Sequence, residues 1–301
     1  MTFSLKLPQN YRSQEVFAFH GRDPEGLAER VEPDRIRKGF VMNGIALVLD
    51  ISLRPGLAGC RVNADGSLAT VSGEKLRRIA RNLLALSIRP EPFEMSVKTD
   101  SLLGPLVQKQ RGLRIPQTAT PFEALTWAII GQQINLPFAI ALRRTLIRLA
   151  GQQHSSGLWC YPDAAAVARL NAEELGRQKF SKAKAEALVR LARMVDSGEL
   201  PIDTWEQRSV EEIAASLLVL KGIGPWTVNY ALLRGFGCED CSLHGDAAIR
   251  NALRRLQGNG ANGTDETKPS IADAQLFLER YKPHRSLAAA HLWASLNFSA
   301  S

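Results

Sequence analysis

The sequence predicts an α+β fold in which a small antiparallel-sheet α/β domain at the N-terminus precedes a mostly α-helical core. From Gly39 to about Thr70, apolar and β-branched residues alternate with polar ones, as in half-buried strands. After Pro90 the apolar residues recur at helical spacing, and typical helix caps stand before the apolar stretches. A chain of 301 residues, 45% of them hydrophobic and 23% charged, is long enough to bury more than one core.

The N-terminal domain is predicted to contain strands followed by one helix. The pairs Pro55-Gly56 and Asp65-Gly66 are turn signals that divide the alternating stretch. The segment 72–86 then predicts a helix, because its large apolar residues fall on one face: Leu76, Ile79, Leu83 and Leu84.

The remainder of the chain is predicted to be a series of helices. Serine, proline or aspartate marks several of their starts, and Ser209 with Glu212 forms a capping box. The predicted helices span 122–130, 137–149, 181–195, 209–220, 246–256, 271–281 and 285–298. The polar, glycine-rich stretch 257–270 predicts a mobile surface loop.

Charge and cysteine content limit the class of protein. A net charge of +8 favours a polyanionic partner, but the basic residues are spread along the chain, so this support for nucleic-acid binding is weak. No apolar run approaches the length of a membrane span. We expect a soluble protein of a reducing intracellular compartment, because the four cysteines do not form a secreted disulfide pattern: Cys60, Cys160, Cys238 and Cys241.

The stretch LKGIGPWTVNYALLRGFG predicts a helix, a tight turn and a second helix. Gly222 and Gly224 free the backbone of the turn, and Pro225 is suited to the first turn of the following helix. Peptide N–H groups at that helix start lack partners, so the turn can hold a DNA phosphate without reading base sequence. The alternative is a turn that only reverses the chain between two packed helices.

The helix after the turn has two apolar faces. Trp226, Tyr230 and Leu233 share one face at helical spacing, which suits either stacking on a base in a cleft or packing in the core. Downstream, Asp246 stands directly before another predicted helix. Its carboxylate can cap that helix, and it can also stabilise a cationic sugar; the two roles are compatible.

These features occur in an order that resembles the helix-hairpin-helix DNA glycosylase superfamily. The segment 218–253 contains LKGIGPWTVNY and, after a loop, HGDAAIR. Within the superfamily, the chain is similar to the 3-methyladenine DNA glycosylase II (AlkA-like) family. The likeness covers almost the whole chain, through GLRIPQTATPFEALTWAIIGQQINLPFAIALRRTL, CYPDAAAVARL, FSKAKAEALVRLARM and YKPHRSLAAAHLW.

The resemblance implies an N-terminal α/β domain, residues 1–92, and a two-lobed glycosylase core. One lobe comprises 93–112 and 237–301 and carries the helix after the aspartate. The other comprises 113–236 and ends in the helix-hairpin-helix, at about 209–235.

The resemblance also implies an activity. Such an enzyme flips an alkylated purine out of duplex DNA and hydrolyses its N-glycosidic bond, the first step of base excision repair. Asp246 matches the catalytic aspartate. Trp226 stands where bifunctional relatives have a Schiff-base lysine, so a monofunctional glycosylase is expected. The alternatives are a non-catalytic lesion-binding protein with the same hairpin and an oxidised-purine glycosylase of the same superfamily.

Further residue roles follow from the resemblance. The base pocket is expected to contain three aromatic residues, Trp226, Tyr230 and Trp293. DNA is expected to contact two loops, at Gln132 and Gln133, which lie where the family inserts a wedge into the minor groove, and at Gly222, Ile223 and Gly224. The carbonyls expected to hold a Na⁺ or K⁺ ion at the hairpin belong to Leu218, Leu220 and Gly222.

No cofactor is expected to be required. The superfamily's iron–sulfur cysteines should follow Asp246, where this chain has none, so no cluster is expected. Cys238, Cys241 and His244 have ligand-like spacing without a fourth zinc ligand. His244 also stands where some relatives have a proline. No site is assigned to the basic helix residues Lys182, Lys184, Arg250, Arg254 and Arg255. We expect a monomer that acts on double-stranded DNA in the cytoplasm at the nucleoid, or in the nucleus of a eukaryote.

Overall fold

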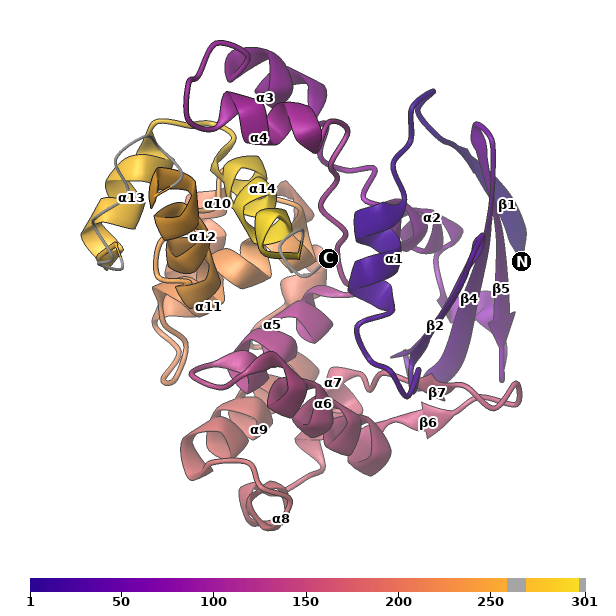
Figure 1. The fold of residues 1–301 in the computed structure, drawn as a ribbon. Helices are drawn as coiled ribbons and strands as arrows, with labels where there is room; N and C mark the ends of the chain where they lie inside the picture. The colour runs from indigo at the N-terminus through magenta and orange to yellow at the C-terminus, as the bar shows by residue number, and fades with distance from the viewer. Residues whose placement is uncertain (259–268, 298–301) are drawn as a thin grey trace.

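An antiparallel sheet forms one side of the protein (Figure 1). The computed structural model describes residues 1–258 and 269–297. The five strands of the sheet are arranged in the order β1-β5-β4-β3-β2, and each pair of neighbours is antiparallel. Their bounds are β1 Thr2–Lys6, β2 Glu29–Glu32, β3 Arg35–Met42, β4 Ile45–Arg54 and β5 Leu57–Ala64.

The predicted antiparallel sheet is confirmed, but its limits differ from the prediction. Pro55-Gly56 is the turn between β4 and β5, whereas Asp65-Gly66 ends the last strand, and a 3₁₀ turn, Leu68–Thr70, follows. The Asp65 carboxylate accepts two hydrogen bonds from Ser155, both at 2.6 Å, which anchor the loop in place of a further strand. The prediction that strands continue to about Thr70 was therefore wrong.

Two helices lie between the sheet and the rest of the molecule (Figure 1). They are α1, Gln14–His20, and α2, Gly73–Leu83. Ser72 caps α2 by accepting a hydrogen bond from the Lys75 amide, and the four apolar residues predicted to face inward are all buried. The prediction of this helix is confirmed. Strands β1 and β2 and helix α1 were not predicted.

The remainder is mostly helical, as predicted, and its one described two-stranded hairpin was not predicted. Two long helices begin at the predicted caps, Ser181 and Ser209, each of which accepts a hydrogen bond from a first-turn amide. Thr120 and Asn135, which were not predicted as caps, act in the same way at the two preceding long helices. The elements are α3 Glu91–Ser96, α4 Gly104–Lys109, α5 Pro121–Gly131, α6 Leu136–Ala150, β6 Gln152–Gln153, β7 Trp159–Cys160, α7 Ala164–Ala168, α8 Ala172–Arg177, α9 Lys182–Asp196, a 3₁₀ helix Ile202–Gln207, α10 Val210–Leu218, α11 Pro225–Ala231, a π-helix Leu232–Phe236, α12 Ala247–Gly258, α13 Ile271–Glu279 and α14 Arg285–Asn297.

The helices from 122 onward were predicted to within about two residues at most ends. Helix α10 ends at Leu218 rather than at residue 220, because the hairpin begins there. Of the predicted surface loop 257–270, residues 259–268 lie outside the described residues, as does the predicted end of the last helix at residue 298.

Two features join the sheet to the helices. The short β6–β7 hairpin docks on β3, where Tyr161 pairs with Phe40, and Gly39 lies so close to the Trp159 carbonyl that any side chain there would collide with it. Beside this contact is a buried group of charges from β2, β3, α5 and α6, in which two carboxylates face two cations: Glu29, Glu123, Lys38 and Arg143.

Residues 93–112 pack against the C-terminal helices. Asp100 accepts hydrogen bonds from Arg280, at 3.2 Å, and from the Tyr281 hydroxyl, at 3.1 Å. Helix α4 contacts α14. Segments far apart in the sequence thus lie side by side, while the exact division into lobes stays a prediction. Among the described residues, no helix combines the length and apolarity required to cross a bilayer.

Candidate active site

The predicted helix-hairpin-helix is present. The Ser209–Glu212 capping box starts α10, and the turn closes with a hydrogen bond of 3.0 Å from the Ile223 amide to the Leu220 carbonyl. Gly222 has φ of +90°, a conformation that glycine adopts without strain. Helix α11 then begins at Pro225, as the sequence predicted. Val219 at the tip is 81% exposed, so the turn projects into solvent.

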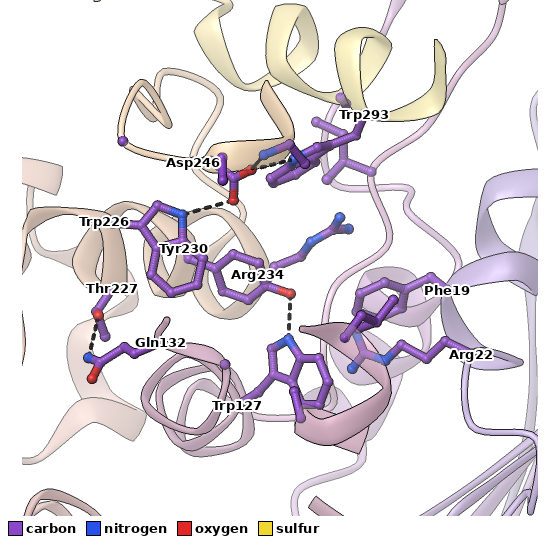
Figure 2. Close-up of a pocket in the computed structure, with 18 of the residues that line it drawn as sticks. Phe19, Arg22, Trp127, Gln132, Trp226, Thr227, Tyr230, Arg234, Asp246 and Trp293 are labelled. Carbon is purple, nitrogen blue, oxygen red and sulfur yellow. Dashed lines mark hydrogen bonds between the residues drawn. The ribbon is translucent and has the colours of Figure 1, made fainter. Parts of the chain in front are cut away.

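A cavity of about 1150 Å³ opens beside this motif. Segments distant in sequence line it: the end of α1, residues 113–116, the loop between α5 and α6, α11, the start of α12, and α14. The predicted residues Gln132, Gln133, Gly224, Trp226, Tyr230, Asp246 and Trp293 all belong to its lining. Figure 2 shows the side chains that converge on it.

Asp246 caps α12 and faces the cavity at the same time. Its Oδ1 atom accepts hydrogen bonds from the amides of Ala248, at 2.8 Å, and Ile249, at 3.1 Å. The indole of Trp293 donates to the same oxygen at 3.3 Å, and the indole of Trp226 donates to Oδ2 at 3.0 Å (Figure 2). Every partner is a donor, which is the environment of an ionised carboxylate. The predicted cap is therefore confirmed, while the second predicted role, stabilisation of a cationic sugar, stays a prediction.

The three predicted pocket aromatics lie together around that carboxylate. The ring centroids of Trp226 and Tyr230 are 5.3 Å apart, and those of Tyr230 and Trp293 are 6.4 Å apart. Trp127, which was not predicted, donates an indole hydrogen bond of 2.8 Å to the Tyr230 hydroxyl and extends the same wall. Leu233, by contrast, is fully buried rather than in the cleft, because the helix continues as a π-helix and its register changes.

Two arginines and a phenylalanine complete the wall. The Arg22 guanidinium carbon lies 4.1 Å from the Phe19 ring centroid and 4.2 Å from that of Trp127. The Arg234 guanidinium lies 4.5 Å from Phe19 and 5.5 Å from Trp293. Cations and rings therefore alternate, and desolvation lowers the pKa of Arg234. Neither Phe19 nor Arg22 belongs to a recognisable motif, so sequence reasoning missed both.

The predicted wedge loop is tied to the hairpin. The Gln132 side chain donates to the Gly222 carbonyl and to the Thr227 hydroxyl, both at 2.9 Å. Gln133 is exposed and has φ of +55°, so it is the glutamine whose side chain is free to meet DNA. Lys184, which was considered only as an exposed helix charge, is buried and donates to the carbonyls of Ile130, at 2.9 Å, and Gln132, at 2.7 Å.

The cysteine pair near the site packs within the fold. The Cys241 thiol lies 3.7 Å from the Cys238 carbonyl, and its contact with Cys238 and its burial hold the pKa of Cys241 well above the usual range. His244 bonds to the Ser242 hydroxyl at 2.9 Å, and desolvation lowers the pKa of His244. In the part of the chain that the structure describes, no group of three or more His, Cys, Asp or Glu residues is placed to hold a metal ion.

The chain is similar in sequence to proteins named as DNA-3-methyladenine glycosylases. No protein-family model matches the chain. It is 31% identical over 215 residues to a DNA-3-methyladenine glycosylase of Bacillus subtilis, which covers 68% of this chain and 67% of that protein. It is 29% identical over 236 residues to DNA-3-methyladenine glycosylase 2 of Escherichia coli, which covers 77% of this chain and 75% of that protein.

The fold matches a solved structure along its full length. The 3-methyladenine DNA glycosylase of Archaeoglobus fulgidus superimposes with a TM-score of 0.82 at 22% identity, covering 99% of both chains. This likeness establishes the same fold. The similarity to the Bacillus subtilis protein, at 31% identity over two thirds of both chains, shows that the chain belongs to the DNA-3-methyladenine glycosylase family.

Proposed function

We propose that the protein is a monofunctional DNA glycosylase that removes alkylated purines, such as 3-methyladenine and 7-methylguanine, from duplex DNA. The observation that carries this proposal is the carboxylate of Asp246, held by two indoles inside a cavity next to the hairpin. A lesion-binding protein needs no ionised acid at that point. Removal of a damaged base starts base excision repair.

The chemistry follows from the placement of the carboxylate. The nucleotide is extruded into the cavity, at a cost of a few kcal/mol in lost stacking. The N-glycosidic bond breaks with its electron pair leaving on the base, and positive charge develops on the sugar as an oxocarbenium ion. Among the described residues Oδ2 of Asp246 accepts from one donor, Trp226, and so retains capacity to face C1′ and stabilise that charge. Water then adds its hydroxide to C1′, and its proton is released.

An alkylated purine needs little further help. Alkylation of a ring nitrogen already makes the base cationic, so it leaves as a neutral molecule without protonation. Among the described residues that line the cavity there is no lysine, and Trp226 stands at the place of the Schiff-base lysine. We therefore expect an abasic product with no strand cleavage, which separates this enzyme from an oxidised-purine glycosylase with lyase activity.

DNA is expected to contact the protein on both sides of the cavity mouth. The amides of Gly222 and Gly224 are expected to hold a phosphate, whereas the Ile223 amide already donates to the Leu220 carbonyl and contributes by shaping the turn. Gln133 is expected to fill the space left by the extruded nucleotide. A Na⁺ or K⁺ ion held by the carbonyls of Leu218, Leu220 and Gly222 stays a prediction; Gly222 already accepts one hydrogen bond there. A monomer located with genomic DNA remains part of the proposal.

The test is base release from methylated duplex DNA. We expect the wild-type protein to release 3-methyladenine and 7-methylguanine, and Asp246→Asn to lose at least about 100-fold in rate, because a charge that stabilises the transition state is removed. Asp163→Asn is the matched control. Asp163 also caps a helix, accepting from the Ala166 amide at 3.0 Å, but it does not line the cavity.

The outcomes separate the candidate functions. Release by wild type and by Asp163→Asn, with loss in Asp246→Asn, supports the glycosylase. Tight binding of lesion-containing DNA without release by any of the three proteins would indicate a binding module. Unchanged release by Asp246→Asn would contradict the role given to the carboxylate.

A further inference from the structure

Arg22 presents hydrogen-bond donors that the protein does not use. It follows α1, and its guanidinium lies against the faces of Phe19 and Trp127, 4.1 and 4.2 Å from the ring centroids (Figure 2). Among the described residues, none accepts a hydrogen bond from this guanidinium and no carboxylate pairs with it. A guanidinium has five N–H donors in a fixed plane, so a cavity wall that contains an unpaired one is suited to a ligand with acceptors.

Two other arginines that line the cavity, Arg234 and Arg114, already donate to backbone carbonyls. A third, Arg250, has an Nε atom without a partner among the described residues, but it lies on α12 one helical turn after Asp246, on the side of the cavity assigned to the sugar. Arg234 donates to the Pro116 carbonyl at 2.5 Å. Arg114 donates to the Ala85 carbonyl at 3.3 Å and approaches Glu91 at 3.7 Å. These two side chains hold the loop 113–116 and α2 in place. Arg22 differs from both, because its planar group is oriented only by ring stacking and stays available.

The position of Arg22 in the cavity indicates which part of a bound base it meets. Figure 2 shows Asp246 on one side of the cavity, with Arg22, Phe19 and Trp127 on the opposite side. If C1′ lies at the Asp246 carboxylate, the nitrogen of the glycosidic bond lies there too, and the base extends away from it. The edge of a purine farthest from that nitrogen carries the substituent at position 6, so this edge faces Arg22.

We propose that Arg22 is a specificity-determining residue that donates hydrogen bonds to an oxo group at position 6 of the extruded purine. Guanine-type bases and hypoxanthine have an oxygen acceptor at this position. Adenine-type bases have an amino group, which presents N–H donors to a group that is itself only a donor. The unpaired guanidinium thereby favours 7-methylguanine and hypoxanthine over 3-methyladenine.

The size of the effect follows from the chemistry of the pair. A hydrogen bond from a charged donor contributes enough to change a rate by about 10-fold to 100-fold. A site built to bond to a polar group also rejects an analogue that lacks it more strongly than an apolar pocket rejects a change of size, because its own polar group is then left unpaired. Arg22 should therefore control the ratio of products more than the overall rate.

The experiment compares two bases in one reaction, and it rests on the proposed function. Duplex DNA treated with dimethyl sulfate contains 7-methylguanine and 3-methyladenine, which are both cationic and differ at position 6. Initial rates of release of both bases are measured by mass spectrometry for wild type, Arg22→Met and Arg22→Lys. Release without enzyme is subtracted. A separate duplex with one hypoxanthine supplies a neutral base with the same oxo group.

The expected result is a change in selectivity. Arg22→Met should lower the ratio of 7-methylguanine to 3-methyladenine by at least about 10-fold and slow hypoxanthine release by a similar factor. Arg22→Lys should give a product ratio between those of wild type and Arg22→Met, because lysine keeps the positive charge but lacks the planar pair of N–H donors. A general loss of folding or of contact with DNA phosphates would lower the release rates of both methylated bases equally.

Three outcomes overturn the inference. The first is an unchanged ratio of the two methylated bases in Arg22→Met, and the second is an equal fall in the release rates of both. The third is faster release of both methylated bases with an unchanged rate for hypoxanthine, which would show that Arg22 acts only by repelling cationic bases. The failure of the proposed function is a separate result, since the wild-type protein would then release none of the three bases.

Discussion

The two indoles that hold Asp246 make unequal contributions to it. Trp226 is the protein donor to Oδ2, whereas Trp293 shares Oδ1 with two backbone amides and donates over a longer distance, 3.3 Å. We predict that Trp226→Phe slows base release by about 10-fold, because a hydrogen bond to a charged group is lost while the ring remains. Trp293→Phe should cost about 3-fold or less, because its oxygen keeps two donors.

Single-turnover rates for the two variants test this difference. Thermal unfolding serves as the control, because neither substitution opens a large cavity. Equal losses in the two variants, or a larger loss in Trp293→Phe, would contradict the assignment of Oδ2 as the oxygen that faces the sugar.

Two buried histidines make stability depend on pH. Desolvation lowers the pKa of His20 to about 4 and that of His291 to about 3. Below pH 6.5 the unfolded chain binds protons that the folded protein does not, so stability falls as pH decreases from about 6.5 towards 4. Each histidine contributes a slope of up to about 1.4 kcal/mol per pH unit.

We predict that His291→Phe makes this dependence shallower. His291 packs beside the ring of Phe93, with centroids 5.6 Å apart, so a phenylalanine ring can occupy the same space. The variant loses the 2.8 Å hydrogen bond between His291 and the buried Gln110 and is therefore less stable at every pH, so the slope is the quantity compared. Urea unfolding of wild type and variant at several values between pH 7 and pH 4.5 measures the two slopes. Parallel curves would show that His291 does not contribute to the acid sensitivity.

Helix α9 fixes the position of the loop between α5 and α6, which contains Gln132 and Gln133. The Lys184 ammonium donates to two carbonyls at the C-terminal end of α5, and Gln132 in the same loop donates to the hairpin. We predict that Lys184→Met weakens binding to duplex DNA with an abasic-site analogue by about 10-fold, because charged hydrogen bonds that fix the loop are lost. Fluorescence anisotropy at fixed salt concentration measures the affinity.

Lys182→Met is the matched control. Lys182 is on the same helix and carries the same charge, but its side chain is exposed and no described residue pairs with it. We expect a change of about 2-fold or less, from the loss of one diffuse charge. Similar losses in the two variants would indicate that Lys184 acts through its charge rather than through the loop.

The helices could be predicted where residues close together in the sequence determine their starts. A serine or asparagine cap followed by apolar residues at helical spacing sets the start of α2, α6, α9 and α10 through local contacts alone. Strand β2 has four residues and β1 has five, and such short strands form only because longer neighbours pair with them. Lys184 was read as exposed because lysine usually is, and only tertiary structure shows the carbonyls that it meets.

The composition of the site was only partly predictable from the sequence, because some of its residues come together only in the folded protein. Asp246, Trp226 and Tyr230 belong to one contiguous motif, so the sequence indicates that they act together. Phe19 in α1 and Arg22 just after it reach the cavity because the sheet and its helices pack against the rest of the molecule, although both precede Trp127 by more than a hundred residues (Figure 1). That packing depends on contacts distant in sequence, which spacing alone does not reveal.

The buried charges at the junction of sheet and helices connect these distant parts. Lys38 lies 2.5 Å from both Glu29 and Glu123, and Arg143 lies 2.6 and 2.9 Å from the same two carboxylates. The cations hold the pKa of Glu29 and of Glu123 below the usual range despite desolvation. The stability that these two groups contribute is therefore present above about pH 4.5 and is lost as pH falls through their folded pKa values.

We predict that Glu123→Gln destabilises the protein by about 3–5 kcal/mol, because two buried cations then face a single carboxylate. Asp50→Asn, which breaks a pair with Arg35, should cost about 1 kcal/mol or less, since Arg35 is 43% exposed. The double variant Glu123→Gln with Lys38→Met balances one anion against one cation again and should recover part of the loss. Denaturant unfolding measures these variants together with Lys38→Met alone, which completes the cycle. If the loss in the double variant equals the sum of the losses in Glu123→Gln and Lys38→Met, the residues do not act as a coupled, charge-balanced group.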